Sequence, residues 1–348
     1  MNMAEKKRRP RSPTGERYYI PQDVTSPLAR LHQRLVARKR PVPRFPRTIQ
    51  IQTQSGCNAA CAFCPNKKTQ TTLSHGRMDE ALFRKIVDEC VAHRLRRISP
   101  YLMNEPLLDP DLPERIRYIA SKKAPRTIVS INTNASKLEG DMARQLLRCG
   151  LDRLSISFHG ISKDTYEASM VGLSFEENLE RVNAFAALLR EAPEPKPETL
   201  ITMVRTRLIE PEIPRITAYW AERGLRAAIR RLGNRAHVSV DEARLNADRW
   251  EPFVSCKRLV RQAYIIYNGD AILCCVDWER STVLGNLRER SLAEVWNGER
   301  AVDIRRRYFA GDTDGLLCGR CKRARGVVKT LQAVRRQVCS GDSGGELR

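Results

Sequence analysis

The chain has 348 residues, of which 41% are hydrophobic, and its mean hydropathy is −0.47. This length suits one large domain with a smaller one and excludes a mini-protein held together by disulfides. No apolar run approaches the roughly 18 residues that cross a bilayer, and the basic N-terminus lacks the apolar segment of a secretory signal. We therefore expect a soluble, cytoplasmic protein with no membrane partner.

The charge of the chain is strongly positive and unevenly placed. There are 62 Lys and Arg against 40 Asp and Glu, a net charge of +22, and two thirds of the excess lies in residues 1–46 and 318–348. Such an excess can attract nucleic acid, but blocks of like charge usually mark flexible tails. No RNA-binding signature accompanies it, and aromatics make up only 6%. We predict a basic arm over 1–46, in which Pro27–Lys39 could form a short helix, a basic flexible tail over 326–348, and no nucleic-acid partner.

Strand-like and helix-like segments alternate from Arg47 onward. Gly150 and Gly224 are typical of helix ends. Because six βα units imply a parallel sheet, and six strands close less completely than eight, the fold predicted for 47–240 is α/β, a partial (β/α)6 TIM-like barrel. The periodicity predicts strands at 47–53, 96–103, 126–132, 152–158, 200–206 and 225–232, and helices at 79–93, 111–121, 141–149, 175–190 and 212–224.

This rhythm ends near residue 240, and a smaller α+β domain is predicted over 241–325. Residues 264–275 indicate a hairpin, with Asn268-Gly269 as a type I′ turn between two apolar runs. One helix is predicted at 291–309.

Eleven cysteines are many for a reducing compartment, and their odd number argues against a disulfide framework, so metal ligation is the natural interpretation. Cys57, Cys61 and Cys64 form a C-x3-C-x2-C motif after the first predicted strand, at the face where a parallel barrel carries its chemistry. Three thiolates on one loop can hold three corners of a cubane and leave the fourth iron for a substrate or cofactor. A zinc site, the alternative, would want a fourth ligand close by.

The C-x3-C-x2-C motif with an aromatic residue, Phe63, before its last cysteine resembles the signature of radical S-adenosylmethionine (radical SAM) enzymes. The resemblance extends over about residues 47–235. It implies a 4Fe–4S cluster on Cys57, Cys61 and Cys64, with S-adenosylmethionine bound at the open iron and Phe63 beside the cofactor.

Two loops that follow predicted strands resemble further elements of that family. Glu105 stands in the place of a Gly-Gly-Glu element, which implies that its carboxylate holds the amino group of S-adenosylmethionine. Met103 and Asn104 replace the two glycines, which puts the close backbone approach of that loop in doubt. Asn134 matches a Thr-Asn-Gly position beyond the third strand.

Four further positions are candidates for cofactor or substrate contact. Ser155 and Ser157 alternate with apolar residues, so both should face the lumen, where the family uses a serine near the ribose or carboxylate of the cofactor; the alternative is plain barrel filling. Arg205 could bind the carboxylate of the cofactor with two hydrogen bonds, or be an outward-facing strand charge. His159, a candidate catalytic residue, could reach the substrate or be a structural hydrogen-bonding group.

A second group of cysteines lies in the C-terminal region. The pattern Cys256-x12-Gly269-x4-Cys274, followed by Cys318-x2-Cys321, resembles the SPASM/twitch extensions of radical SAM enzymes. The cysteines that continue the full SPASM pattern are missing. The resemblance implies a second, auxiliary 4Fe–4S cluster on these four cysteines, for a total of two; four cysteines with a CxxC also suit zinc.

The remaining cysteines have no place in either cluster. If Cys274 and Cys275 are neighbours on a strand, they point to opposite faces, so one thiol is spare. Cys275 would then be a buried, inert thiol or a hydrogen-atom donor to a substrate radical. Cys90 and Cys149 fall on apolar helix faces and are predicted to be core residues, and Cys339 is given no role.

The chemistry implied by the resemblance begins with one electron from an external donor such as flavodoxin or ferredoxin. Cleavage of S-adenosylmethionine then gives a 5′-deoxyadenosyl radical that takes hydrogen from the substrate. We expect a small polar substrate, such as a sugar, aminocyclitol or nucleoside, and dehydrogenation or epimerisation with the auxiliary cluster as electron acceptor or relay. One alternative is a peptide-modifying SPASM maturase, although the arm over 1–46 looks too short for a leader-binding domain. The other is a basic, RNA-directed Fe–S protein.

Overall fold

The computed structural model describes residues 42–233, 235–237, 242–247 and 256–321. Most of the predicted basic arm, the short helix at Pro27–Lys39, the tail over 326–348 and Cys339 lie outside the described residues. Among the helices of the described part, none has the length and hydrophobicity needed to cross a membrane.

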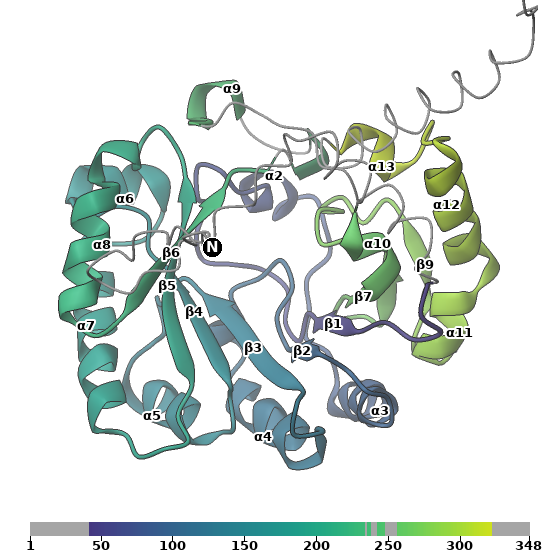
Figure 1. Cartoon of the computed structure of the whole chain (residues 1–348), viewed down its shortest axis with the longest axis horizontal. Coiled ribbons are helices and arrows are strands. Elements are labelled where there is room, and N and C mark those ends of the chain that lie inside the picture. The colour runs from purple at the N-terminus through teal and green to yellow at the C-terminus, as the bar shows by residue number, and fades with distance from the viewer. Residues whose placement is uncertain (1–41, 234, 238–241, 248–255, 322–348) are drawn as a thin grey trace, which may run out of the picture.

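A nine-stranded sheet in the order β6-β5-β4-β3-β2-β1-β7-β8-β9 organises the molecule. Its first six strands pair in parallel with their sequence neighbours, and the sheet curves with helices on its outer face (Figure 1). The order does not close on itself, which confirms the predicted partial barrel. These strands are β1 (Thr48–Ile51), β2 (Arg97–Ser99), β3 (Ile128–Thr133), β4 (Arg153–Ser157), β5 (Glu198–Arg205) and β6 (Arg226–Arg231).

All five predicted barrel helices are present, and several short helices lie in the loops between them. The predicted strand at 96–103 is shorter, because β2 ends at Ser99 and the chain turns into the loop before η1 (Pro106–Leu108). The five helices are α3 (Glu80–Val91), α4 (Leu112–Lys122), α5 (Gly140–Arg148), α7 (Phe175–Glu191) and α8 (Ile213–Glu222). The further short ones are α2 (Asn66–Thr69), α6 (Lys163–Ser169), η2 (Glu210–Glu212), η3 (Arg235–His237) and α9 (Glu242–Leu245).

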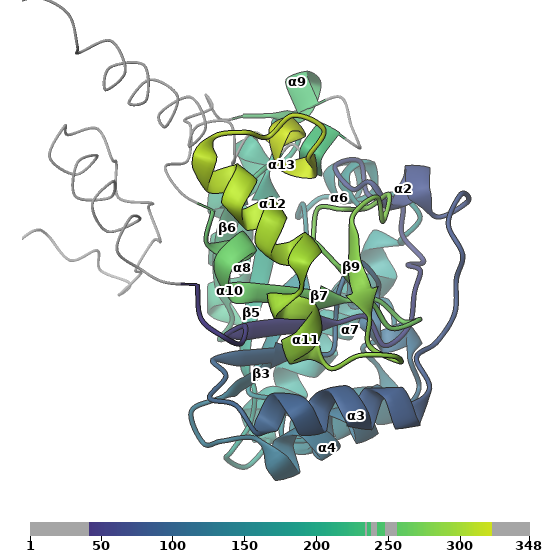
Figure 2. The same cartoon turned by 90° about the vertical axis from the view of Figure 1, so that its right-hand side faces the viewer.

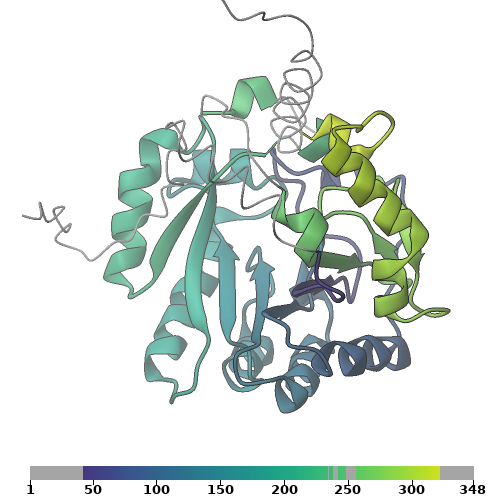
Figure 3. The same cartoon turned by 45° about the vertical axis from the view of Figure 1, so that its right-hand side comes forward.

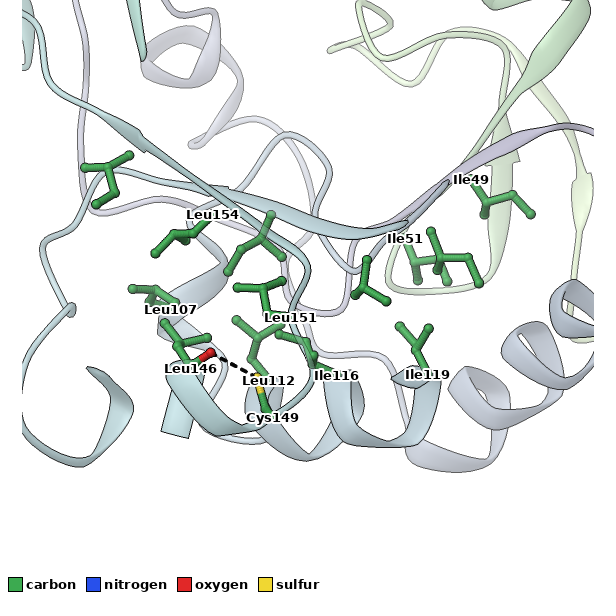
Figure 4. Packing of buried hydrophobic residues seen from close by; sticks show 14 of the residues in the cluster. Ile49, Ile51, Leu107, Leu112, Ile116, Ile119, Leu146, Cys149, Leu151 and Leu154 are labelled. Carbon is green, nitrogen blue, oxygen red and sulfur yellow. Dashed lines mark hydrogen bonds between the residues drawn. The ribbon is translucent and has the colours of Figure 1, made fainter. Parts of the chain in front are cut away.

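The main core lies between the strands and the outer helices. Alternate strand residues, such as Ile49, Ile51 and Leu154, are fully buried there against α4 and α5 (Figure 4). Cys149 belongs to this core, and its thiol donates a hydrogen bond to the carbonyl of Leu146. Cys90 is also fully buried in it, so both cysteines are core residues as predicted. Because strand side chains alternate between faces, the polar residues between these apolar ones face the concave side.

The C-terminal region continues the same sheet. β7 (Gln262–Ile265) pairs in parallel with β1, and β8 (Asp270–Ile272) and β9 (Val283–Asn286) follow as antiparallel strands. Figure 2 shows the helices of this region beside β7 and β9, and Figure 3 shows the teal α/β units and the yellow-green C-terminal helices on opposite sides of the molecule. The helices are α10 (Lys257–Arg261), α11 (Leu292–Asn297), α12 (Glu299–Ala310) and α13 (Leu317–Arg320).

Two local predictions in this region were wrong. The hairpin is present, but its turn is not type I′: the amide of Gly269 donates to the carbonyl of Ile266, and only Gly269 has a positive φ, +98°. The turn is thus centred one residue earlier, on Tyr267-Asn268, with glycine in the left-handed position after it. The single helix predicted at 291–309 is two helices, because Gly298 takes an extended backbone (φ −65°, ψ 157°) between α11 and α12.

Gly150 and Gly224 offer a matched test of helix packing. Both follow the last residues of a barrel helix with a left-handed backbone, φ +82° and +75°. A Cβ on Gly150 would lie 2.5 Å from the Cβ of Ala120 in α4, whereas none of the described atoms lies within 4 Å of one on Gly224. We expect Gly224→Ala to lower the free energy of unfolding by roughly 1–2 kcal/mol for the backbone alone, and Gly150→Ala by about 1–3 kcal/mol more. Urea denaturation of the two variants measures both losses; equal losses would contradict the contact with α4.

Candidate active site

The first cysteine group lies in a loop that the rest of the barrel holds by its backbone. Gly56, with φ +90°, begins the turn away from β1. The amides of Ala60 and Ala62 donate to the carbonyls of Val171, just after α6, and Ser169, its last residue, at 2.8 and 3.0 Å. The loop that carries Cys57, Cys61 and Cys64 is therefore fixed against the βα unit that follows β4.

The three thiols of this loop are free of disulfides and lie close enough to act on one another. Burial, together with the charges of Glu105 and Cys64, raises the pKa of Cys57 to about 12. The amide of Ala59 and the Nδ2 of Asn134 donate to the Cys57 Sγ at 3.5 and 3.7 Å. A metal ligand must be a thiolate, so thiols that oppose one another's ionisation fit a site whose positive charge comes from bound iron. Among the described residues, no three His, Cys, Asp or Glu side chains converge as the ligands of one metal ion would.

The Glu105 carboxylate is buried beside this loop, 2% exposed. It accepts hydrogen bonds from the Thr133 hydroxyl and the Asn134 amide, each at 2.6 Å, and from the Leu107 amide at 3.1 Å. Burial outweighs these bonds and raises its pKa to about 7. Met103, which stands at the place of the first of the two glycines, takes a left-handed φ of +52°.

Asn134 connects the Glu105 loop to the cysteine loop. Its Nδ2 also donates to the Asn58 Oδ1 at 3.0 Å, and its carbonyl accepts from the Nδ2 of Asn178 in α7 at 3.1 Å. Asn178 in turn donates to the Tyr166 hydroxyl at 2.6 Å. Asn58 and Asn178 were missed by the sequence, where an asparagine in a loop or helix carries no distinguishing pattern.

Strand β4 places Ser155 and Ser157 as predicted, on the face opposite the buried Leu154 and Ile156; Ser155 is buried and Ser157 half-buried. Arg205, at the end of β5, donates from Nε to the Glu210 Oε2 at 2.6 Å and pairs with that carboxylate. Any carboxylate bound by Arg205 would compete with Glu210.

His159 lies against Phe63 of the cysteine motif, with ring centroids 4.6 Å apart. Its Nδ1 accepts from the Val204 amide at 3.0 Å, and burial lowers its pKa to about 3. The imidazole is thus neutral, with its proton on Nε2, and it positions Phe63; a role toward the substrate stays a prediction.

The second cysteine group packs around one small apolar cluster that includes Leu273, Ile304 and Tyr308. Burial, together with the neighbouring Cys256 and Cys321, raises the pKa of Cys318 to about 12. All the cysteines of this group are free of disulfides; they are Cys256, Cys274, Cys275, Cys318 and Cys321.

The prediction that Cys274 and Cys275 point to opposite faces of a strand was wrong. β8 ends at Ile272, and both cysteines lie in a turn that the Asp277 amide closes by donating to the Cys274 carbonyl at 2.9 Å. The two thiols are hydrogen-bonded to each other, which lowers the pKa of Cys275. They therefore share one side of the turn.

Comparison with known proteins shows that each cysteine group lies in a region that matches a known domain family. Residues 51–204 match the model of the radical SAM superfamily, and residues 256–322 match SPASM, an iron–sulfur cluster-binding domain. The chain thus contains a radical SAM domain followed by a SPASM domain. The cofactors predicted from the sequence, 4Fe–4S clusters and S-adenosylmethionine, are confirmed as those of these domains.

Individual relatives of this radical SAM protein are distant. It is 20% identical over 275 residues, 78% of the chain and 91% of the relative, to the S-adenosyl-L-methionine-dependent 2-deoxy-scyllo-inosamine dehydrogenase of Niallia circulans. Its fold is similar to BtrN in complex with AdoMet and 2-DOIA (TM-score 0.51, 18% identity, 76% of this chain and 87% of that one). It is also similar to Streptococcus suis SuiB bound to precursor peptide SuiA (TM-score 0.63, 14% identity, 86% and 74%).

Two residues of this radical SAM protein that the sequence did not single out lie between the cysteine groups. Burial raises the pKa of Tyr101, and the charges of Arg235 and Cys64 act on it. Arg235 also lowers the pKa of Cys275, so its guanidinium is near both groups. Tyr101 was hidden in the overlong predicted strand, and Arg235 gives no sequence signal.

Arg258 of α10 is a second cation beside the C-terminal cysteine group. The charges of Cys275, Cys274, Tyr264 and Cys256 raise its pKa against the effect of burial, and none of the described carboxylates pairs with it. A guanidinium surrounded by thiols favours their anionic, metal-binding form.

We expect Arg258→Met to make the auxiliary cluster harder to reduce, because an added electron would lose its nearby positive charge. Arg258→Lys keeps the charge and should leave the midpoint potential close to that of the parent. An EPR-monitored redox titration in a Cys57/Cys61/Cys64→Ala background, which keeps only the auxiliary cluster, measures the shift. An unchanged potential in the Met variant would place Arg258 away from the bound cluster.

Proposed function

We propose that this protein oxidises a small polyhydroxylated substrate by radical SAM chemistry, with the auxiliary cluster as the electron acceptor. The observation that carries the proposal is that the loop before Glu105 and the second cysteine group pack on one apolar cluster. In that cluster Met103, beside Asn104 and Glu105, packs with Tyr264, Cys274 and Cys275. A substrate beside the Glu105 loop would thus be near the auxiliary cluster as well.

The chain's residues would divide the work as follows. Cys57, Cys61 and Cys64 would hold the first cluster, and Cys256, Cys274, Cys318 and Cys321 the auxiliary one. Glu105 would accept the amino group of S-adenosylmethionine, with Asn134 fixing the cysteine loop. Its other contacts would come from residues on or near the concave face: Phe63, Ser155, Ser157 and Arg205.

When bound and reduced by an external one-electron donor, such as flavodoxin or ferredoxin, the first cluster supplies the electron that cleaves S-adenosylmethionine to methionine and a hydrogen-abstracting 5′-deoxyadenosyl radical. Oxidation of a substrate CH–OH to a carbonyl then balances: one hydrogen atom goes to 5′-deoxyadenosine, one proton leaves the hydroxyl, and one electron passes to the auxiliary cluster. The fixed loops supply orientation.

Dehydrogenation is favoured over epimerisation by the surroundings of Cys275. Epimerisation would need a thiol that returns a hydrogen atom to the substrate radical. Cys275 is instead hydrogen-bonded to Cys274 and close to Arg258, beside the four cysteines that would hold the auxiliary cluster. The relative that matches this chain over 91% of its own length is named a dehydrogenase, which supports the same choice.

Peptide modification is the second candidate. The fold is shared with SuiB, whose structure contains a precursor peptide, and an identity of 14% supports the fold alone. A peptide substrate would also be modified beside Glu105, so the two candidates differ in the ligand and share the chemistry.

Iron content tests the two-cluster assignment. After anaerobic reconstitution we expect about eight irons per chain, as two 4Fe–4S clusters require, and about four in the Cys57/Cys61/Cys64→Ala variant. Dithionite reduction with S-adenosylmethionine should give 5′-deoxyadenosine from the parent and none from the variant.

The buried Cys90 and Cys149 provide matched controls for this loss of thiols. Their alanine variants should keep eight irons and the 5′-deoxyadenosine product, because both side chains lie in the outer core. Zinc in place of the second four irons would remove the electron acceptor, and absence of iron would overturn the proposal.

The carboxyl of Glu105 predicts a pH-dependent response to S-adenosylmethionine. Its folded-state pKa, about 7, lies above the ordinary value of 4.5, so it stabilises the unliganded fold below pH 4.5 and loses that contribution as the pH rises through about 7. A bound ammonium group supplies the missing counter-charge. We expect S-adenosylmethionine to raise the Tm of the protein more at pH 7.5 than at pH 6.

Glu105→Gln should remove this difference between the two pH values, since its amide does not titrate. Differential scanning fluorimetry with and without S-adenosylmethionine measures it. An equal pH dependence in parent and variant would show that Glu105 does not meet the amino group.

A further inference from the structure

The concave face of the barrel sheet carries an excess of arginine. Because side chains alternate along a strand and register partners share a face, the strand residues between the buried core positions point to the concave side. Among the residues of β1–β6 that point there, the charged ones are four arginines and one carboxylate. They are Arg97 of β2, Arg153 of β4, Glu198 of β5, and Arg226 and Arg230 of β6.

Glu198 neutralises part of this charge and leaves two arginines without a counter-ion. The Arg153 Nε donates to the Glu198 Oε2 at 2.9 Å, and Arg226 forms an ion pair with the same carboxylate. No ion pair joins Arg97 or Arg230 to any carboxylate of the described residues. Arg97 is half-buried and Arg230 is exposed, so a ligand can reach both side chains.

The contacts around Arg97 fix the side of the sheet on which it lies. Its neighbour Ile98 is fully buried in the outer core, so Arg97 and Ser99 point the other way. The Ser99 and Ser130 hydroxyls are hydrogen-bonded to each other at 2.9 Å, between β2 and β3. The concave face next to Arg97 is therefore polar.

Arg97 and Arg230 are close enough to repel each other. Partial burial, together with the charges of Arg153, Arg96 and Arg230, lowers the pKa of Arg97. In the sheet order three strands separate β2 from β6, which in a flat sheet would place them about 19 Å apart. The repulsion therefore acts across the concave side of the curved sheet (Figure 1), where two cations without counter-ions share one surface.

The concave face is open to solvent between these arginines and the candidate active site. Asn132 is exposed although it lies in β3, an inner strand of the sheet, and Gln50 of β1 is half-buried. The residue after Asn132 is Thr133, whose hydroxyl donates to the Glu105 carboxylate at 2.6 Å. An accessible polar strip thus leads from the level of Arg97 to the Glu105 loop.

The two unpaired guanidinium groups select the ligand chemistry. A half-buried cation among like charges is unfavourable until an anion pairs with it. A guanidinium group can give two parallel hydrogen bonds to a carboxylate or a phosphate. A cationic ligand would be repelled, and a neutral hydroxyl group would leave both charges uncompensated.

We propose that Arg97 and Arg230 bind the carboxylate or phosphate group of a small anionic substrate that lies along the concave face, with its reacting end toward Glu105. Arg97 is level with Ile128 of β3, and the five steps from there to Thr133 span roughly 17 Å. With the reach of the side chains, a sugar acid or sugar phosphate suits this span. That the bound anion is the substrate rests on the proposed function; the binding itself does not.

The test is isothermal titration of D-glucose 6-phosphate, D-gluconate and uncharged D-glucose into reconstituted holoenzyme with S-adenosylmethionine. We expect saturable binding of at least one anion, and the one that binds tells phosphate from carboxylate. Arg97→Met and Arg230→Met each remove one guanidinium group from a long side chain. Each should weaken that binding roughly tenfold to a hundredfold, as the loss of a charge-assisted hydrogen bond does.

Arg96→Met is the matched control. Arg96 is exposed and immediately precedes β2, so the variant removes the same charge next to Arg97 from a position that alternation places on the other side. It should leave the affinity for the anion nearly unchanged. Equal weakening by Arg96→Met and Arg97→Met would reduce the effect to net charge and overturn the proposal.

Stability distinguishes a binding role of Arg97 from a structural one. Because Arg97 has like-charged neighbours and no counter-ion, Arg97→Met should not lower the Tm of the unliganded protein. A lower Tm with unchanged anion binding would make Arg97 a structural residue and overturn the proposal. Equal affinity for D-glucose, no saturable binding of either anion, or binding of an RNA oligonucleotide alone would also overturn it.

The same preparation separates the two proposals. Formation of 5′-deoxyadenosine without anion binding would overturn the arginine site and keep the radical chemistry. Anion binding without 5′-deoxyadenosine would do the reverse.

Discussion

The parallel pairing of β1 with β7 is the constraint on which the rest of the structure depends. Without it β1 would be an exposed edge of a six-stranded sheet, with unpaired backbone groups beside the cysteine loop. With it, four residues of β1 align with four of β7, and the amide of Gln52 continues the ladder to the Ile265 carbonyl at 2.8 Å. The segment that carries the second cysteine group is therefore a continuation of the barrel sheet, and its position relative to the first group is fixed by backbone hydrogen bonds.

This connection places polar and apolar groups in different layers. The outer layer is a sealed apolar core between strands and helices, in which Cys90 and Cys149 are fully or almost fully buried. The concave side carries amides, hydroxyls and the Glu105 carboxylate. That carboxylate accepts short hydrogen bonds from Thr133 and Asn134. Rigid positioning of reactive groups needs such support from a packed scaffold.

The fold was predictable from the sequence where the periodicity was strong. The strands and helices of the barrel appear within a few residues of their predicted ends, because alternating apolar residues must reach one core. The continuity of the sheet was not predictable, since nothing in 262–265 shows that its partner is β1, more than 200 positions earlier. The same holds for the turn at Gly269 and the break at Gly298, where tertiary contacts decide between local conformations that the residues allow equally.

Of the site, only the residues that form a motif with a fixed spacing could be predicted from the sequence. Three cysteines on one loop are visible as a motif, whereas Arg258, Tyr101 and Asn178 act through contacts between elements distant in sequence and leave no pattern. For Cys274 and Cys275 the sequence misled. As neighbours on a strand they would point to opposite faces, but β8 ends at Ile272, so neither lies on a strand.

Several buried polar side-chain atoms near the site have no hydrogen-bond partner among the described residues. An unpaired buried donor or acceptor costs about 1–3 kcal/mol, so a protein selected for stability alone would pair or replace it. The Oε1 of Gln52, the Nδ2 of Asn104 and the Nε1 of Trp278 are all unpartnered, and they lie along the loops that flank the two cysteine groups. Because these atoms have almost no solvent-accessible surface, a group could pair with them only if the loops that carry them move.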